Sequence, residues 1–408
     1  MFAIVLLHTF FTKFFERLAH ARPRHAGLLH LLGEVEVVFG FWAMVLVLCM
    51  AAISGAGPSI AYLESRNYTE PMFVFVTMVM AGTRPVFEAS ASLVRALMRG
   101  MPLQCGNSMY FLCLALVPLM GSFITEPATM TLAALMLRDT LLSRPVSQRL
   151  KYATVCVLFV NVSIGGTLTP FAAPSVLMVA GAWGWEMPFM LSKFGWKAAL
   201  VVLVNVACAT WLFRHQVGHV GAAAPPGDAH PTVPWGVTAV HLVFLALVVA
   251  AAHHPVVFMG LFLFFLRFVT EYRQHQSPLI LREALLVAFF LEGLVVLGGM
   301  QQWWLQPVLM GMSADAVFFG AALLTAFTDN ATLTYLGSLV EGLSPAFQVA
   351  LVGGAVTGGG LTVIANAPNP VGAAILKTRF PHQSIHPLGL LAAALSPTLV
   401  AALAFRLL

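Results

Sequence analysis

The sequence is dominated by apolar runs about as long as a lipid bilayer is thick. Apolar windows between charged borders predict full spans near residues 31–53, 71–98, 152–182, 196–213, 235–252, 254–270, 279–297, 345–376 and 386–406. Of the 408 residues, 59% are hydrophobic and 9% are charged, whereas soluble proteins carry about 25% charged residues. Alternating ten-residue strands are absent, so the predicted fold class is an all-α polytopic membrane protein.

The basic residues predict the topology. They are spread along loops and form no patch with interleaved aromatics, which argues against a nucleic-acid partner. With the amino terminus in the cytoplasm, most of the 21 Lys and Arg face the cytoplasm, and only Arg66, Lys193, Lys197 and Arg406 lie outside. We therefore expect a multi-pass protein of the cell (inner) membrane, with a cytoplasmic amino terminus, an outer carboxyl terminus and Arg84 inside the membrane.

The amino-terminal segment 1–30 is predicted to be an amphipathic helix in the membrane interface. Its basic residues follow the apolar run, whereas in a cleaved signal peptide they precede it. The five cysteines lie in or beside apolar segments without CxxC spacing, so we interpret them as reduced core residues and expect no cofactor.

Two long apolar segments carry an acidic residue at their centres. Residues 108–143 contain "TEPAT" and residues 314–343 contain "TDNAT", and each segment is long enough for two helices. We interpret both as re-entrant hairpins that enter and leave the membrane on the same side. A single crossing by either hairpin would invert every later loop and remove the charge bias.

The two hairpins belong to an internal repeat. Thr125 to Thr131 (TEPATMT) matches Thr328 to Thr334 (TDNATLT), and "GGTLTPFAAP" from Gly165 matches "GGLTVIANAP" from Gly359. A Gly- and Pro-rich linker at 215–234 separates a first repeat, 31–214, from a second repeat, 235–408. By the predicted topology the repeats are inverted, an architecture in which secondary transporters bind substrate near the midplane.

Each repeat has a span interrupted by glycines and prolines, at 152–182 and 345–376. Such residues weaken a helix and free backbone groups in mid-membrane, which are tolerated where they line a wet or ion-filled cavity. The alternative is a packing kink. The residues concerned are Gly165, Gly166 and Pro170 in the first half, and Gly358, Gly359, Gly360, Pro368 and Pro370 in the second.

These motifs resemble those of the ion transporter superfamily, which includes divalent-anion/sodium symporters, arsenite permeases and NhaD-type sodium/proton antiporters. The resemblance rests on "SIGGTLTPFAAP" (163–174), the paired hairpins, "HLLGEVEVVFGFWA" near the start and "TDNATLTYLGSLVEG" later. It implies a homodimer with a scaffold domain and a transport domain of hairpins and broken helices that moves as an elevator. The chain resembles the Na+/H+ antiporter members most, although its first half is one span shorter than in dicarboxylate symporters.

The hairpin tips predict the cargo. The resemblance implies Ser-Asn-Thr tips for carboxylate substrates, whereas this chain has Glu126 and Asp329, whose charges would repel an anion and attract a cation. Na+ prefers oxygen ligands. A buried carboxylate also binds protons, so Na+ and H+ can compete for it. The predicted ion-binding residues are Glu126, Thr125, Thr129, Thr167, Thr169 and Ser163 in the first half, and Asp329, Asn330, Thr328, Thr332, Thr362, Asn366 and Asn369 in the second.

Several of these residues have a plain structural alternative. Asp329 and Glu126 could cap helices, and Asn366 and Asn369 could satisfy loop backbone groups. His253 and His254 are interpreted as exposed loop residues.

Other acidic and basic residues are candidates for proton coupling or the ion pathway. Arg84 and Glu88, four residues apart, could form a structural ion pair or belong to the pathway. Glu292 is a candidate for proton coupling that is either neutral or faces Arg84. Glu36 could belong to a cytosolic funnel for cations or to a solvated interface.

The predicted function is exchange of Na+ for H+ across the membrane. The alternatives are a Na+-coupled organic-anion (carboxylate) transporter, or an anion or arsenite permease of the same fold. An enzyme is not expected, because the sequence lacks GxGD and HExxH motifs and its histidines cluster in loops.

Overall fold

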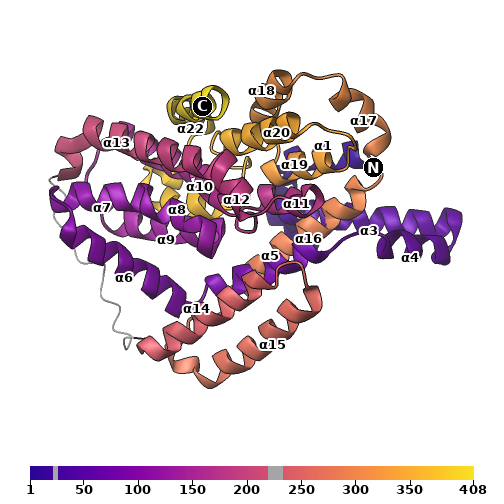
Figure 1. Ribbon diagram of the computed structural model, residues 1–408, viewed down its shortest axis with the longest axis horizontal. Coiled ribbons are helices and arrows are strands. Elements are labelled where there is room, and N and C mark those ends of the chain that lie inside the picture. The colour runs from indigo at the N-terminus through magenta and orange to yellow at the C-terminus, as the bar shows by residue number, and fades with distance from the viewer. Residues whose placement is uncertain (22–25, 219–232) are drawn as a thin grey trace.

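The computed structural model describes residues 1–21, 26–218 and 233–408, and every regular element within these ranges is a helix. The prediction of an all-α fold is confirmed. Figure 1 shows an elongated arrangement in which α3 and α4 extend from one end of the molecule, while α14 and α15 lie along another edge. Most of the predicted linker, 215–234, lies outside the described residues.

The amino-terminal segment folds as two helices, α1 (Phe2–Ala21) and α2 (Ala26–Gly33). The indole of Trp42 on α3 (Val35–Ser54) donates to Nδ1 of His8 at 3.0 Å. Nε2 of His8 therefore carries the ring proton and donates to the Leu32 carbonyl at 3.1 Å. This imidazole ties α1 to both helices that follow it.

The pair α3 and α16 (Leu281–Gly298) joins the two halves of the chain. Both helices carry a glycine at the contact, and a Cβ on Gly293 would lie 2.4 Å from the Gly40 amide nitrogen. An ion pair between Arg282 Nη2 and Glu34 Oε1 at 2.6 Å joins the starts of the two helices. Small residues let helix backbones approach closely where lipid provides no hydrophobic drive.

A bent helix pair precedes each predicted hairpin. The window 71–98 is not one straight span, because α5 (Thr69–Ala81) and α6 (Arg84–Gly100) meet at 66°. Gly82 and Pro85 explain the break, since glycine lowers helix propensity and proline favours the first turn of a new helix. In the second half, α16 meets α17 (Gln302–Met310) at 83°.

The first half continues with the predicted hairpin and interrupted span. The first arm consists of α7 (Cys105–Leu114) and α8 (Leu116–Ile124), and the second arm is α9 (Glu126–Asp139), which packs back against α8. Helix α10 (Gln148–Gly165) ends in a short 3-10 turn, and α11 (Pro174–Trp183) begins after non-helical residues 169–173. The half closes with α12 (Met187–Met190), a π-helical turn and α13 (Trp196–Gly218).

The second half follows a related order. It begins with α14 (Trp235–Ala250) and α15 (Pro255–Glu271), followed by α16 and α17. Helices α18 (Ala314–Thr325) and α19 (Asn330–Ser338) flank the second tip, and α20 (Pro345–Gly358) and α21 (Asn369–Leu376) flank the second break. The chain ends in α22 (Pro387–Leu407). The first half has two helices, α3 and the nine-residue α4 (Ala56–Glu64), where the second has α14 and α15.

The central helices of the two halves are interleaved. Helix α9 packs against α21, α19 packs against α11, and α10 crosses α20. The helix that follows each acidic tip therefore contacts the helix that follows the break in the other half. At 1.5 Å per residue, α9 is about 21 Å long and α11, α19 and α21 are about 12–15 Å long, all shorter than a ~30 Å hydrocarbon core.

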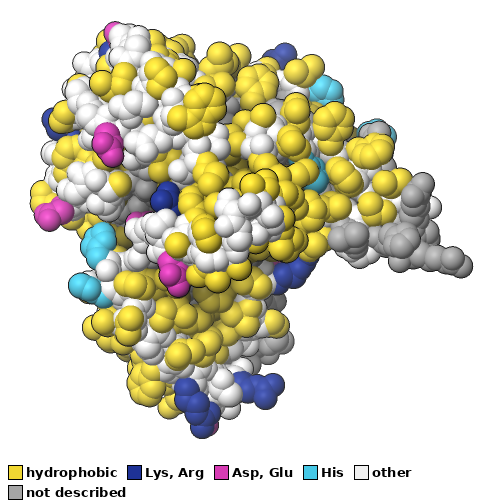
Figure 2. All heavy atoms as spheres, turned by 90° about the vertical axis from the view of Figure 1, so that its right-hand side faces the viewer, with side chains coloured by type: hydrophobic (Ala, Val, Ile, Leu, Met, Phe, Trp, Pro, Cys, Tyr) yellow, Lys and Arg dark blue, Asp and Glu magenta, His cyan; other side chains and the backbone are white. Residues whose placement is uncertain are grey.

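Within the described residues, five helices are long and apolar enough to cross a membrane, or up to seven if each bent pair is one span. The sequence predicted more spans than this. Fewer helices are long enough because glycines and prolines divide several of the predicted spans into short helices. The first arm of the first hairpin, formed by α7 and α8 (Cys105–Ile124), is long enough for a full span. Figure 2 shows hydrophobic side chains over most of one face, with charged groups in isolated patches.

Candidate functional site

The first hairpin tip buries a carboxylate. Thr125 joins α8 to α9 with φ of 78°, a conformation that is rare for a β-branched residue. It places Glu126 at the start of α9 with no exposed surface. Glu126 Oε2 accepts a hydrogen bond from Asn366 Nδ2 at 2.9 Å, and Oε1 has no partner among the described residues. The carboxylate does not cap α9, so the capping alternative fails here.

The first break makes room for this carboxylate. A Cβ on Gly166 would lie 2.4 Å from Glu126 Oε1, so a larger residue at this position would displace the Glu126 side chain. Ser122 ties the break to the hairpin, because its Oγ donates to the Gly165 carbonyl at 2.7 Å and accepts from the Leu168 amide at 2.9 Å. Thr169 Oγ1 donates to the Ser122 carbonyl at 2.6 Å. The hairpin tip and the first break therefore form one hydrogen-bonded unit.

The second tip places Asp329 at the start of α19. Its carboxylate accepts from the Ala331 amide at 2.8 Å, so the predicted capping role is present. The backbone amides of Thr332 and Ala367 also face this carboxylate. Asp329 is only partly buried. Because the side chain is still partly exposed, capping and ion binding are compatible.

Side chains from three helices converge on Gly359 in the second break. Asn369 Nδ2 donates to the Gly359 carbonyl at 2.7 Å and to the Thr362 carbonyl at 2.9 Å. A Cβ on Gly359 would lie 2.1 Å from Ser163 Oγ and 3.0 Å from Asn330 Nδ2. Ser163 Oγ itself donates to the Val356 carbonyl at 2.8 Å. The two halves thus meet in a compact set of uncharged oxygen and nitrogen groups.

Unpartnered polar atoms gather around these tips and breaks. Buried polar groups in proteins nearly always have a partner, so a concentration of exceptions calls for an explanation such as a water or an ion. Other unpartnered atoms are scattered over the described residues, but this region holds the largest group: Thr125 Oγ1, Glu126 Oε1, Ser175 Oγ, Asn330 Oδ1 and Nδ2, Thr332 Oγ1, Thr357 Oγ1, Asn366 Oδ1 and Asn369 Oδ1. All but one of these atoms are oxygens, the donor type that Na+ prefers.

Two other acidic groups lie within electrostatic range of Asp329. Glu126 and Asp329 lie close enough to interact electrostatically, and Glu36 on α3 lies within the same range of Asp329. Ionised carboxylates within such a range repel one another in a low-dielectric interior, and a bound cation or proton relieves that repulsion. The arrangement therefore favours binding of positive charge.

The other predicted hydroxyl ligands lie in the same region but are mostly engaged as donors. Thr129 Oγ1 donates to the Glu126 carbonyl at 3.0 Å and Thr167 Oγ1 to the Ile164 carbonyl at 2.7 Å. Thr362 Oγ1 donates to the Ala326 carbonyl at 2.9 Å. A donating hydroxyl keeps its lone pairs, so these groups can still coordinate a cation. Thr328 is partly exposed and follows the end of α18.

The candidates for proton coupling or the pathway lie apart from the tips. Arg84 Nε pairs with Glu88 Oε1 at 2.5 Å on α6, as the ion-pair interpretation predicted. Glu292 is half-buried on α16, near Tyr68. Glu36 is the member of this group that lies within electrostatic range of a tip. His253 and His254 are exposed at the turn between α14 and α15, as the loop interpretation expected.

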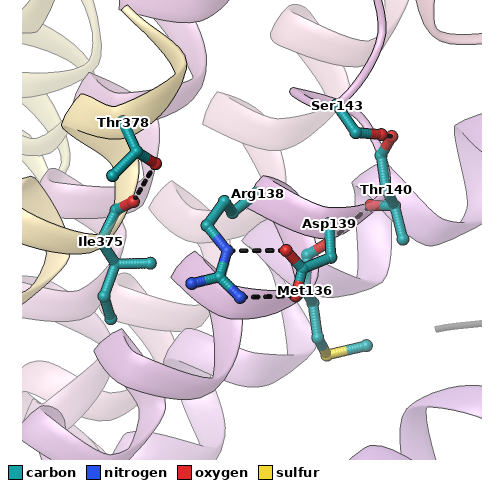
Figure 3. Close-up of polar contacts among 7 residues, drawn as sticks. All are labelled: Met136, Arg138, Asp139, Thr140, Ser143, Ile375 and Thr378. Atoms are coloured by element: carbon teal, nitrogen blue, oxygen red, sulfur yellow. Dashed lines mark hydrogen bonds and ion pairs between the residues drawn. The ribbon is translucent and has the colours of Figure 1, made fainter. Parts of the chain in front are cut away.

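The carboxyl-terminal end of α9 is held by hydrogen bonds between residues that are close in sequence (Figure 3). Arg138 donates to Asp139 through Nε at 2.6 Å and Nη2 at 2.8 Å, and Thr140 Oγ1 donates to the Met136 carbonyl at 2.6 Å. Thr378 Oγ1 donates to Ile375 at the end of α21. The charge of Arg138 is thus neutralised by its neighbour, about 18 Å along the helix from Glu126.

Sequence reasoning missed several polar residues of this region. Ser122 lies in an apolar run, and Ser175 and Thr357 flank the breaks without belonging to the matched motifs. Asn161 Nδ2 donates to the Leu114 carbonyl at 2.8 Å, and Asn205 Nδ2 donates to Asn161 Oδ1 at 3.1 Å. The available signal was a polar residue within a predicted span, which in a membrane protein marks a site or an interhelical contact.

Comparison with known families identifies the family of the chain. A family model described as "Putative Na+/H+ antiporter" matches residues 1–408, the whole chain. The chain belongs to this family. Membership in the antiporter family confirms the predicted resemblance to Na+/H+ antiporters and the prediction that the chain is not an enzyme. Together with the apolar helices, it makes the chain a multi-pass membrane protein. No curated protein matches this antiporter-family chain.

Proposed function

We propose that the chain exchanges Na+ for H+ across the membrane, with both ions competing for Glu126 and Asp329. The observation that carries the proposal is the group of unpartnered oxygens around the buried Glu126 carboxylate and the partly buried Asp329 carboxylate, whose charges repel one another when both are ionised. A cation or a proton relieves that repulsion, and the two need not bind together. Competition alone is sufficient for exchange.

The oxygen donors are sufficient for a hard monovalent cation. Glu126 Oε1 and Asn366 Oδ1 belong to residues already linked by a hydrogen bond, and both oxygens are unpartnered. Asn330, Asn369 and Thr332 supply further uncharged oxygens near the second break. A site with fixed negative charge is unsuited to a carboxylate or another anion, because the anion would add to the repulsion. A cation as cargo follows from this argument.

The proposal extends to inverted repeats within the ion transporter superfamily. Each half contains, in order, two helices, a bent pair, helices that flank an acidic tip, helices that flank a Gly- and Pro-rich break, and a long terminal helix. The contacts of α9 with α21 and of α19 with α11 are equivalent under exchange of the halves. Helices α10 and α20 are each capped by a serine, Ser147 and Ser344. A transport domain of hairpins and broken helices that moves as an elevator, a homodimeric assembly and a cytoplasmic amino terminus complete the proposal.

The test is transport by purified protein in proteoliposomes that contain a pH-sensitive dye. Addition of Na+ without any organic substrate should move protons, and Asp329→Asn should abolish the signal while the protein remains folded and inserted. Lack of Na+-driven proton movement in the native protein would refute the exchange. Wild-type exchange by the variant would remove Asp329 from the mechanism. A signal that requires an added organic acid would instead indicate a Na+-coupled anion transporter.

A further inference from the structure

Two clefts on one side of the molecule meet at Thr69, Glu70, Gly181 and His253. The larger, of about 440 Å³, lies between the α4–α5 connection and α19. The smaller, of about 240 Å³, runs between the start of α5 and α11, and we call it the α5–α11 cleft. Its wall includes Pro170 and Phe171 of the first break. The cleft therefore extends from the surface to the end of the first break, four residues after Gly166, the residue that contacts the Glu126 carboxylate.

The two clefts differ in charge. The α5–α11 cleft is lined by two carboxylates, Glu70 and Glu186, and its lining contains neither Lys nor Arg. The larger cleft contains Arg66 as well as Glu70. The guanidinium of Arg66 lies 4.9 Å from the centre of the Tyr62 ring and donates to Ser65 Oγ. Negative charge is thus concentrated in the α5–α11 cleft.

Glu70 is held where the two clefts join. Its Oε1 accepts from Asn67 Nδ2 at 3.1 Å, and Asn67 Oδ1 accepts from the Thr69 amide at 3.0 Å. The turn before α5 therefore fixes the carboxylate through one oxygen. Among the described residues, the other oxygen, Oε2, has no hydrogen-bond partner. One oxygen positions the side chain and the other remains available to a cation in the cleft.

We propose that the α5–α11 cleft is the aqueous route between this side of the membrane and the first break, and that Glu70 draws the cation into it. A cleft of one charge sign with low-dielectric walls concentrates counter-ions and accelerates their capture. Pro170 directly follows Thr169, which is hydrogen-bonded to Ser122 at the hairpin. The cleft therefore ends one residue along the chain from the hydrogen-bonded unit around Glu126. The identity of the cargo rests on the proposed function, whereas the cation-selective cleft does not.

The transport test compares Glu70→Gln with the native protein and with Glu64→Gln. Glu64 is an exposed acid on α4, close in sequence and outside both clefts. Removal of one charge a few ångströms from the ion path should raise the Na+ concentration for half-maximal exchange by about five-fold or more. The maximal rate should stay within two-fold, Glu64→Gln should behave as the native protein, and Glu70→Asp should restore most of the affinity. An unchanged half-saturating concentration in Glu70→Gln overturns the proposal.

A second measurement does not require transport. Ala252→Cys places a thiol in the α5–α11 cleft, in a background without exposed Cys105 and Cys208 and half-buried Cys49. A cationic methanethiosulfonate should modify it faster than an anionic one of similar size, and Glu70→Gln should reduce that rate ratio about five-fold. Equal rates for both reagents, or a ratio unaffected by Glu70→Gln, overturn the proposal. A Glu70-dependent ratio in a protein that shows no Na+-driven proton movement would support the cleft and refute only the exchange.

Discussion

Substitution of Asn366 by alanine tests the contact between the first hairpin tip and the second break. The amide of Asn366 donates to Glu126 Oε2 at 2.9 Å, and both residues are almost completely buried. A hydrogen bond to a charged group contributes about 1.5–3 kcal/mol. Because Glu126 Oε1 already lacks a partner, the variant leaves the whole carboxylate without a donor.

The expected result is weaker Na+ binding. Without the Asn366 donor, the carboxylate is less stable as an anion and protons compete better, and a candidate oxygen ligand is lost as well. About 1.5–3 kcal/mol corresponds to roughly a 10- to 100-fold rise in the Na+ concentration for half-maximal exchange. The assay is the Na+ dependence of dye-reported proton movement at two pH values one unit apart, and the deficit should be larger at the lower pH.

Asn161→Ala is the matched control. Asn161 is equally buried and hydrogen-bonded, but its partners are the Leu114 carbonyl and Asn205, not a carboxylate. It should lower the melting temperature without changing the half-saturating Na+ concentration. If Asn366→Ala behaves in the same way, with lower stability and Na+ dependence within two-fold of the native protein, then Asn366 is structural and the reasoning about the site is wrong.

Three further predictions follow from the packing and from ion competition. Gly166→Ala should reduce exchange at least about ten-fold, because the new Cβ would lie 2.4 Å from Glu126 Oε1. The control is Gly57→Ala, where no atom lies within 4 Å of the new Cβ. A Gly166→Ala variant with native exchange would contradict the close approach of Gly166 to Glu126. Gly293→Ala should destabilise the fold by about 1–3 kcal/mol, seen as a lower melting temperature in detergent, because its Cβ would clash with the backbone of Gly40; an unchanged melting temperature would show that α3 and α16 can separate freely. Acidification should raise the half-saturating Na+ concentration by up to about ten-fold per pH unit, as expected for one proton competing with one cation, and a pH-independent value would exclude competition.

The sequence predicted the local features of the site correctly. The acidic motifs at Glu126 and Asp329 do lie at the starts of helices, and both Gly- and Pro-rich stretches do interrupt helices. These features depend on residues adjacent in the chain: glycine and proline weaken a helix wherever they stand, and an aspartate before a helix finds the free amides of its first turn. Such properties need no knowledge of the rest of the fold.

Contacts between distant segments were not predictable. The sequence assigned the predicted ion-binding residues to two separate sets, one in each half. In the structure the hydrogen-bond donor to Glu126 is Asn366, which belongs to the other half and lies 240 residues away in the chain. Glu36 was predicted to belong to a cytosolic funnel for cations or to a solvated interface, and its proximity to Asp329 emerged only when α3 was placed beside the second half. Glu70, at the junction of the two clefts, drew no attention because an acid beside a turn is common at a helix start.

The apolar runs and the duplicated acidic and glycine-rich motifs determined, from sequence alone, that this is an all-helical membrane protein with two interrupted helices and two acidic tips. Lipid forces each helix to satisfy its own backbone hydrogen bonds, so length and composition are sufficient for that conclusion. Only the tertiary structure decided that the halves interleave, with α9 against α21 and α19 against α11. Side-chain packing and hydrogen bonds between helices select that arrangement, and they depend on which surfaces meet in space, not on the order of residues along any one helix.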